Sequence, residues 1–155
     1  MASRRKGRIL AFQALYSWDV HCSLGTIISG AVPDAALDAA APALLDFSWA
    51  QPAASNEELK AFSRLLVTGT IENIKAIDSM IQKHLINWEI ERLNRVDLAV
   101  LRMSVYTLMF QSDMPASIVI DEAIGISKEY GADDSFRFIN GVLDNIRKTL
   151  ETAGQ

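Results

Sequence analysis

Residues 118–146 constrain the fold of this 155-residue chain more than any other stretch, because they predict a helix, a tight turn and a second helix. Gly131 is expected to close the first helix in the left-handed conformation. Asp133, Asp134 and Ser135 are residue types that cap a helix N-terminus by accepting hydrogen bonds from its unpaired amides. The second helix then gains one buried face from apolar residues at helical spacing, which are Phe136, Ile139, Val142, Leu143, Ile146 and Leu150.

Phe138 does not belong to that buried face. At about 100° per residue it lies at the border of the apolar stripe, near Asp134 and Arg137. An aromatic ring at the edge of a buried face, beside an acid and a cation, is the first indication of a binding surface.

The rest of the chain also follows helical spacing, and no stretch shows the alternation typical of a strand. We expect a helix over 3–22, and a long helix from the capping box of Ser55 and Glu58 to about residue 84, with a bend at Gly69. Another is expected from Val96 to residue 111 or 112, before Pro115 opens the next.

Two connecting segments are less regular. The segment 25–55 is rich in alanine and proline, with a short helix expected over 34–46 and with Phe47 and Trp49 packed against the body. The connector 86–94 is expected to hold a short helix, with Trp88 and Leu93 facing inward. The prediction is therefore an all-α fold, a single domain over residues 1–155 built as a compact bundle of six to seven helices.

The charge of the chain is unevenly distributed. Net charge is −4, yet Arg4, Arg5, Lys6 and Arg8 all lie in the first ten residues, and the 19 acids lie elsewhere. Cations at a helix N-terminus are unfavourable, because the helix dipole is already positive there, unless an anion binds to them and to the free amides. A frayed basic tail is the alternative, and spacing alone leaves both open.

Enzymatic and metal chemistry find little support in the sequence. One cysteine and two histidines cannot form a zinc cluster, and His21 and Cys22 are neighbours that do not face each other on a helix. The glycines of the helical regions are isolated, so a glycine-rich phosphate loop is absent. We therefore predict no catalytic residues, no metal and no cofactor.

The same composition bears on location. A single cysteine rules out an internal disulfide, which favours the cytoplasm. No uninterrupted apolar run approaches the roughly 20 residues of a membrane span, so we expect no membrane association.

Three blocks of sequence together suggest a family. The first runs from Arg4-Arg5-Lys6-Gly7-Arg8 into Gln13-Ala14-Leu15-Tyr16, and the second covers 91–106, with Glu91-Arg92-Leu93 and Arg95-Val96-Asp97. The third covers 122–144, with Tyr130-Gly131-Ala132-Asp133-Asp134-Ser135 and Phe138-Ile139-Asn140-Gly141-Val142-Leu143-Asp144. The chain resembles the NusB family of bacterial transcription antitermination factors over nearly its whole length, except for a longer and more Ala/Pro-rich 25–55 segment. The third block is the most specific.

This resemblance implies a NusB-like RNA-binding fold without catalysis. NusB-like proteins bind the boxA element of ribosomal RNA leader transcripts, together with a small-subunit ribosomal protein called NusE in this role. The complex helps RNA polymerase pass terminators, with NusA and NusG as further components. These partners are therefore expected here.

The resemblance also assigns site residues. Phosphate and base contacts carry over to Arg4, Arg5, Lys6 and Arg8, and Asp134 is expected to accept base amino or imino protons. The remaining RNA positions are Tyr130, Arg137 and Phe138. Glu91 and Asp97 match acidic positions that face the ribosomal protein. Lys6 and Gly7 replace the more usual arginine and alanine, so a looser first helical turn is expected.

The residues support RNA binding independently, since single-stranded RNA is recognised by base stacking, hydrogen bonds to base edges and phosphate neutralisation. One alternative is a protein-only adaptor with a solubilising basic tail and a buried Phe138. Another is the related RNA-binding domain of ribosomal RNA methyltransferases, although the chain has no room for a cofactor domain. A homodimer would form if an exposed apolar patch paired with itself.

Overall fold

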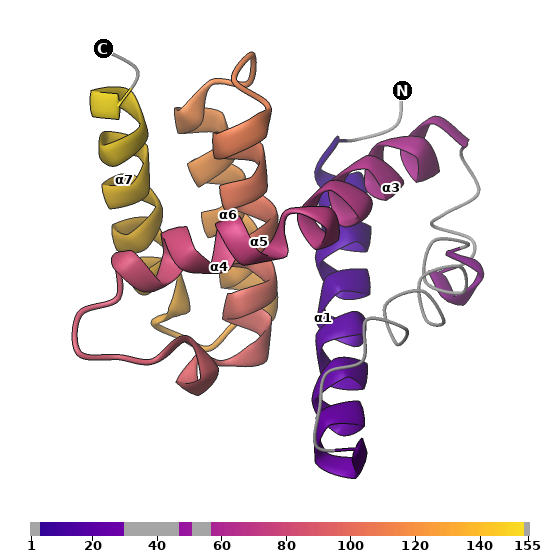
Figure 1. The fold of residues 1–155 in the computed structure, drawn as a ribbon. Helices are drawn as coiled ribbons and strands as arrows, with labels where there is room; N and C mark the ends of the chain where they lie inside the picture. The colour runs from indigo at the N-terminus through magenta and orange to yellow at the C-terminus, as the bar shows by residue number, and fades with distance from the viewer. Residues whose placement is uncertain (1–3, 30–46, 51–56, 154–155) are drawn as a thin grey trace. The chain divides into compact units, whose positions relative to one another are not determined.

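All regular structure in the described part of the chain is helical (Figure 1). The computed structural model describes residues 4–29, 47–50 and 57–153. The helices of this part are α1 (Arg4–Ser29), α3 (Glu57–Glu72), α4 (Ile74–Lys83), α5 (Arg95–Phe110), α6 (Ala116–Tyr130) and α7 (Ser135–Ala153), with short 3-10 helices η1 (Ser48–Ala50) and η2 (Ile90–Arg92). The all-α prediction is confirmed. The helix expected over 34–46 and the cap at Ser55 lie outside the described residues.

The chain divides into two compact units, 1–68 and 69–155, which are described separately. The expectation of a single domain stays a prediction. No helix among the described residues is both long enough and apolar enough to cross a membrane.

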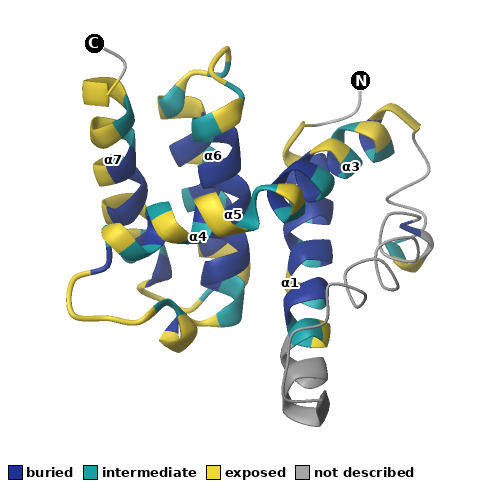
Figure 2. Ribbon diagram, viewed as in Figure 1, coloured by how far each residue is buried: buried dark blue, intermediate teal, exposed yellow. Residues whose placement is uncertain are grey.

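In the first unit, Gly7 allows α1 and α3 to approach closely. A Cβ atom at Gly7 would lie 2.5 Å from Cδ1 of the Phe62 ring, and the Ser63 hydroxyl donates to the Gly7 carbonyl oxygen at 2.8 Å. Most α1 residues from Gly7 to Trp18 are buried, as the apolar pattern predicts (Figure 2). Phe47 is fully buried in this unit, whereas Trp49 is 46% exposed, so only the first of these two rings packs inward.

The expected long helix over 55–84 is interrupted at Asn73, and the prediction of one continuous helix bent at Gly69 is wrong. The Asn73 side-chain amide donates to the Gly69 carbonyl oxygen at 2.8 Å, and its backbone N–H donates to the same oxygen at 3.2 Å. The break itself lies in the backbone of Asn73, whose φ of −112° and ψ of 20° are not helical. Asparagine favours such positions, because its side chain competes for backbone partners. Gly69 is needed instead for packing, since a Cβ atom there would overlap the Tyr106 ring.

Helix α5 forms the centre of the second unit and contacts α4, α6 and α7. Its residues from Asp97 to Thr107 are all buried, and Figure 2 shows this along most of the helix. One of them, Arg102, donates two hydrogen bonds to Asp78 of α4, at 2.9 and 2.8 Å. A part-buried ion pair therefore joins the central helix α5 to α4.

The turn between α6 and α7 differs from expectation at Gly131. Its φ of −91° and ψ of −177° are extended, so the predicted left-handed conformation is wrong. Crowding explains the glycine, because a Cβ atom would lie 2.7 Å from the Ser127 carbonyl oxygen and 3.0 Å from Cβ of Ser135. Oγ of Ser135 accepts from the Ala132 N–H at 3.1 Å and so closes the turn.

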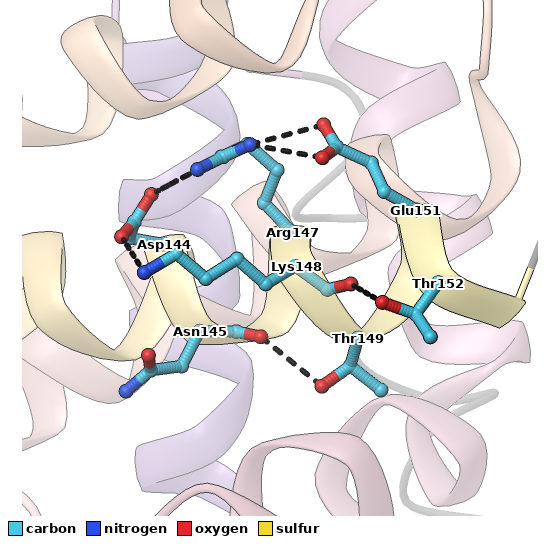
Figure 3. Close-up of polar contacts among 7 residues, drawn as sticks. All are labelled: Asp144, Asn145, Arg147, Lys148, Thr149, Glu151 and Thr152. Carbon is cyan, nitrogen blue, oxygen red and sulfur yellow. Dashed lines mark hydrogen bonds and ion pairs between the residues drawn. The ribbon is translucent and has the colours of Figure 1, made fainter.

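The two faces of α7 have contrasting chemistry. Its buried face holds Ile139, Val142, Leu143 and Ile146, as the spacing predicts. Ion pairs occupy a more exposed face (Figure 3), where Arg147 bonds to Asp144 at 2.7 Å and to Glu151 at 3.0 Å, and Lys148 lies 3.2 Å from Asp144. The hydrogen bond from Arg147, followed by that from Lys148, lowers the pKa of the Asp144 carboxyl.

Candidate nucleic-acid interface

The basic start of the chain lies in the first turns of α1, in the first unit. Arg4, Arg5 and Lys6 are exposed there, and the Arg4 guanidinium lies 4.7 Å from the centre of the Phe62 ring. Arg8 is only 7% exposed, with its guanidinium 5.6 Å from the same ring. Three of the four cations are thus open to an anion, whereas Arg8 is largely covered.

A second group of predicted residues surrounds the α6–α7 turn, in the second unit. Asp134 is exposed and directly precedes α7, and Phe138 lies in the first turn of that helix. Phe138 is half-buried, which confirms its position at the border of the apolar stripe. Tyr130 is 38% exposed at the end of α6, and the exposed Arg137 has its guanidinium 5.6 Å from the centre of the Phe136 ring. That this group and the basic start form one surface stays a prediction.

A cavity of about 590 Å³ adjoins Phe138 within the second unit. The α4–α5 connection, the start of α5 and the first half of α7 form its walls. Trp88, Arg92, Asp97, Arg137 and Phe138 are among the lining residues. Residues predicted separately for RNA and for a protein partner, Phe138 and Asp97, therefore share one cavity.

Sequence reasoning missed Trp88, which was expected to face inward but is 48% exposed. Its neighbour Asn87 has a φ of 57°, a left-handed conformation that asparagine tolerates better than most residues. The chain turns there and leaves Ile86 85% exposed as well. Asn87 was the available signal, because an asparagine between two apolar residues in a connector indicates a turn. The inward position of Leu93, which is 8% exposed, is confirmed.

Asp97 is buried at the wall of the cavity and is only 8% exposed. Burial raises the pKa of its carboxyl group, against the opposing effect of a hydrogen bond with the Ser135 side chain. Its Oδ1 atom is shielded from solvent and has no hydrogen-bond partner. Glu91, the other acid predicted to face a protein partner, is exposed on η2. Both assignments to a partner stay predictions.

Asp97→Asn is expected to raise the free energy of unfolding at pH 7 by about 1 kcal/mol, because it removes a buried and incompletely paired charge. A raised folded-state pKa means that the native state binds this proton more tightly than the unfolded state. The wild-type side chain therefore contributes stability that is fully present at pH values below 3.8, the usual pKa of aspartate. This contribution is lost as the pH rises through the pKa of Asp97 in the folded state.

Urea unfolding of both proteins at pH 7 and pH 4 measures this effect. The advantage of Asp97→Asn should shrink at the lower pH, because the raised pKa favours protonation of the native wild-type carboxyl as the pH falls. Asp121→Asn, at an exposed position of α6, is the control and should show no comparable gain. A variant less stable than wild type at pH 7 would show that the carboxylate is better accommodated than its burial indicates.

The chemistry of these sites is that of binding. Carboxylates accept hydrogen bonds, guanidinium groups pair with phosphates, and the aromatic rings offer stacking faces. Within the described ranges, histidine, cysteine, aspartate and glutamate side chains do not gather into a group of three that could hold a metal ion.

Comparison with known proteins agrees with this chemistry. The model of the NusB family matches residues 5–148. The transcription antitermination protein NusB of Treponema denticola is 50% identical over 145 residues, which cover 93% of this chain and 95% of that protein. The corresponding protein of Treponema pallidum (strain Nichols) is 45% identical over 148 residues, covering 94% of this chain and 93% of that protein.

Solved structures show the same similarity. Thermotoga maritima NusB superposes with a TM-score of 0.76 and 32% identity, covering 96% of this chain and 93% of that one. A chain from a crystal structure of the antitermination factors NusB and NusE in complex with double-stranded RNA gives a TM-score of 0.69 and 27% identity, with 94% and 96% coverage. Both curated relatives are transcription antitermination proteins. With a family match over most of its length and relatives of this identity, the chain belongs to the NusB family.

Proposed function

We propose that this protein binds the boxA RNA of ribosomal RNA leader transcripts together with the ribosomal protein NusE. In this complex it would help RNA polymerase pass terminators in the cytoplasm, with NusA and NusG as further components. The observation that carries the proposal is the α6–α7 turn, where the exposed Asp134 directly precedes α7 and the half-buried Phe138 lies in the first turn of that helix.

The chemistry of this turn suits single-stranded RNA. A partly open ring such as Phe138 can stack on an unpaired base, and the Asp134 carboxylate can accept a hydrogen bond from base amino or imino groups. Arg137 and the exposed cations Arg4, Arg5 and Lys6 can neutralise phosphates. Arg8 is expected to contribute less, because it is largely covered.

NusE is the proposed protein partner. A related NusB has been crystallised with NusE and RNA, which supports the same pairing here. The net charge of −4 favours a basic partner, and Glu91 offers an exposed carboxylate. Complementary charge of this kind raises association rates and disfavours wrong partners.

A titration of boxA RNA and of a scrambled RNA into the protein tests the proposal, with and without NusE and at two salt concentrations. The complex with NusE is expected to bind boxA RNA more tightly than the scrambled RNA at both salt concentrations. Equal affinity of the complex for the two RNAs would contradict it.

Phe138→Ala is expected to weaken boxA binding by about 1–3 kcal/mol, the usual contribution of one stacked base. The slope of log affinity against log salt should stay nearly unchanged, because the substitution removes no charge. Phe110→Ala is the matched control, since Phe110 is a 46% exposed ring at the opposite end of α5 from Asp97. Equal affinities of Phe138→Ala and wild type would exclude stacking on this ring.

A further inference from the structure

The cavity beside Phe138 has lining residues that the proposed function does not use, above all Trp88 and Arg92 of the α4–α5 connection. We propose that this cavity receives one unstacked RNA base, held against the rings of Trp88 and Phe138. This inference rests on the proposed RNA-binding function and adds a specific place for one nucleotide.

The two aromatic rings come from separate elements and line the same cavity. Trp88 precedes η2 and is 48% exposed, although a ring of that size is usually covered in a folded protein. Phe138 lies in α7 and is half-buried. The cavity volume of about 590 Å³ falls within the range of small-ligand sites, so it suits a base with its sugar.

The charges around the cavity favour an anionic ligand. Arg92 and Arg137 are both exposed and line the cavity from η2 and from α7. Two guanidinium groups so placed can pair with the phosphates on either side of an inserted base. They would also repel a lysine or arginine side chain of a protein partner, so the RNA base fits better than a basic peptide.

The wall of the cavity contains an acceptor that lacks a partner. Asp97 lines the cavity, and its Oδ1 makes no hydrogen bond and is shielded from solvent. A small rotation of the carboxyl group would expose this oxygen to an amino or imino N–H on the base edge. An N–H donor would then satisfy an oxygen that is otherwise unpaired.

The test measures the affinity of the protein–NusE complex for boxA RNAs that each carry one abasic nucleotide. The wild-type complex should bind one of these abasic RNAs about 10-fold more weakly than intact boxA RNA, as expected for the loss of one stacked base. Trp88→Ala should weaken intact boxA RNA by about 10-fold and abolish the further loss at that same position. Trp88→Phe should retain most of the affinity, because it keeps a stacking face.

Phe110→Ala is the control for loss of an exposed ring, and its abasic profile should match that of wild type. Thermal unfolding of Trp88→Ala checks that the variant folds. A different result is that wild type binds boxA selectively while every abasic RNA loses the same affinity in wild type and in Trp88→Ala. That result would overturn the proposed base site and leave the proposed function standing. Failure of wild type to prefer boxA over scrambled RNA would overturn both. Weaker NusE binding by Trp88→Ala in the absence of RNA would assign the cavity to the protein partner and overturn the inference.

Discussion

Arg102→Ala is expected to lower the free energy of unfolding by about 3 kcal/mol, because it removes one partner of a largely buried ion pair. The Arg102 side chain is 11% exposed and donates to both carboxylate oxygens of Asp78, at 2.9 and 2.8 Å. The substitution leaves the Asp78 carboxylate, 28% exposed, without its cation beside the central helix α5. Chemical denaturation followed by circular dichroism at pH 7 measures the loss.

Arg147→Ala is the matched control, since Arg147 is also an ion-paired arginine but lies at the surface of α7, where it pairs with Asp144 and Glu151 (Figure 3). Exposed pairs contribute little to stability, because solvent screens the charges and the side chains lose freedom. Equal losses for the two arginines would show that burial of the Arg102 pair is unimportant. The double variant Arg102→Ala with Asp78→Ala should recover part of the loss, because no uncompensated carboxylate remains.

The helices could be predicted from the sequence because their signal is local. In α7, apolar residues at helical spacing identify both the helix and its buried face, and the same spacing places Phe138 at the border of that face. The asparagine that caps α5 acts locally too, since the Asn94 side chain accepts from the Val96 N–H at 2.8 Å. Such features depend on residues within one or two turns.

The structural roles of the glycines could not be predicted from the sequence. Gly131 was expected to supply a left-handed conformation, but steric crowding by Ser127 and Ser135 is what requires it. Gly69 was expected to bend a helix, yet the break follows at Asn73 and Gly69 provides space for Tyr106. A sequence shows that a glycine is present, but only tertiary packing shows whether its conformation or its lack of a side chain is needed.

The residues of the candidate site could be proposed from the sequence, but the shape of the site could not. Periodicity and the charge pattern identified the basic start, Asp134 and Phe138. The cavity depends on contacts between elements that are distant in sequence, since the α4–α5 connection brings Trp88 to the same space as Phe138. Asp97 of α5 lines the same cavity, and its neighbours in the sequence give no sign of that position.

Replacing Arg4, Arg5 and Lys6 together by alanine is expected to lower boxA affinity about 100-fold at physiological salt and to reduce the salt slope by about 2. The three side chains are exposed in the first turn of α1, where helix amides and cations can both face a phosphate. Each lost contact with single-stranded RNA should remove about 0.7 from the slope. Affinity measured between 50 and 200 mM salt gives both quantities.

The matched control replaces Lys75, Lys83 and Lys148 by alanine, three exposed cations outside the predicted RNA contacts. Both triple variants change the net charge equally, so a difference between them reports local phosphate contacts and not the overall field of the protein. Arg8 is kept in both, because it is largely covered and packs near Phe62. Equal losses of affinity would mean that the basic start attracts RNA only through net charge, which would remove it from the site. A loss confined to the Arg4, Arg5 and Lys6 variant, with an unchanged melting temperature, would instead tie the first turn of α1 to the RNA.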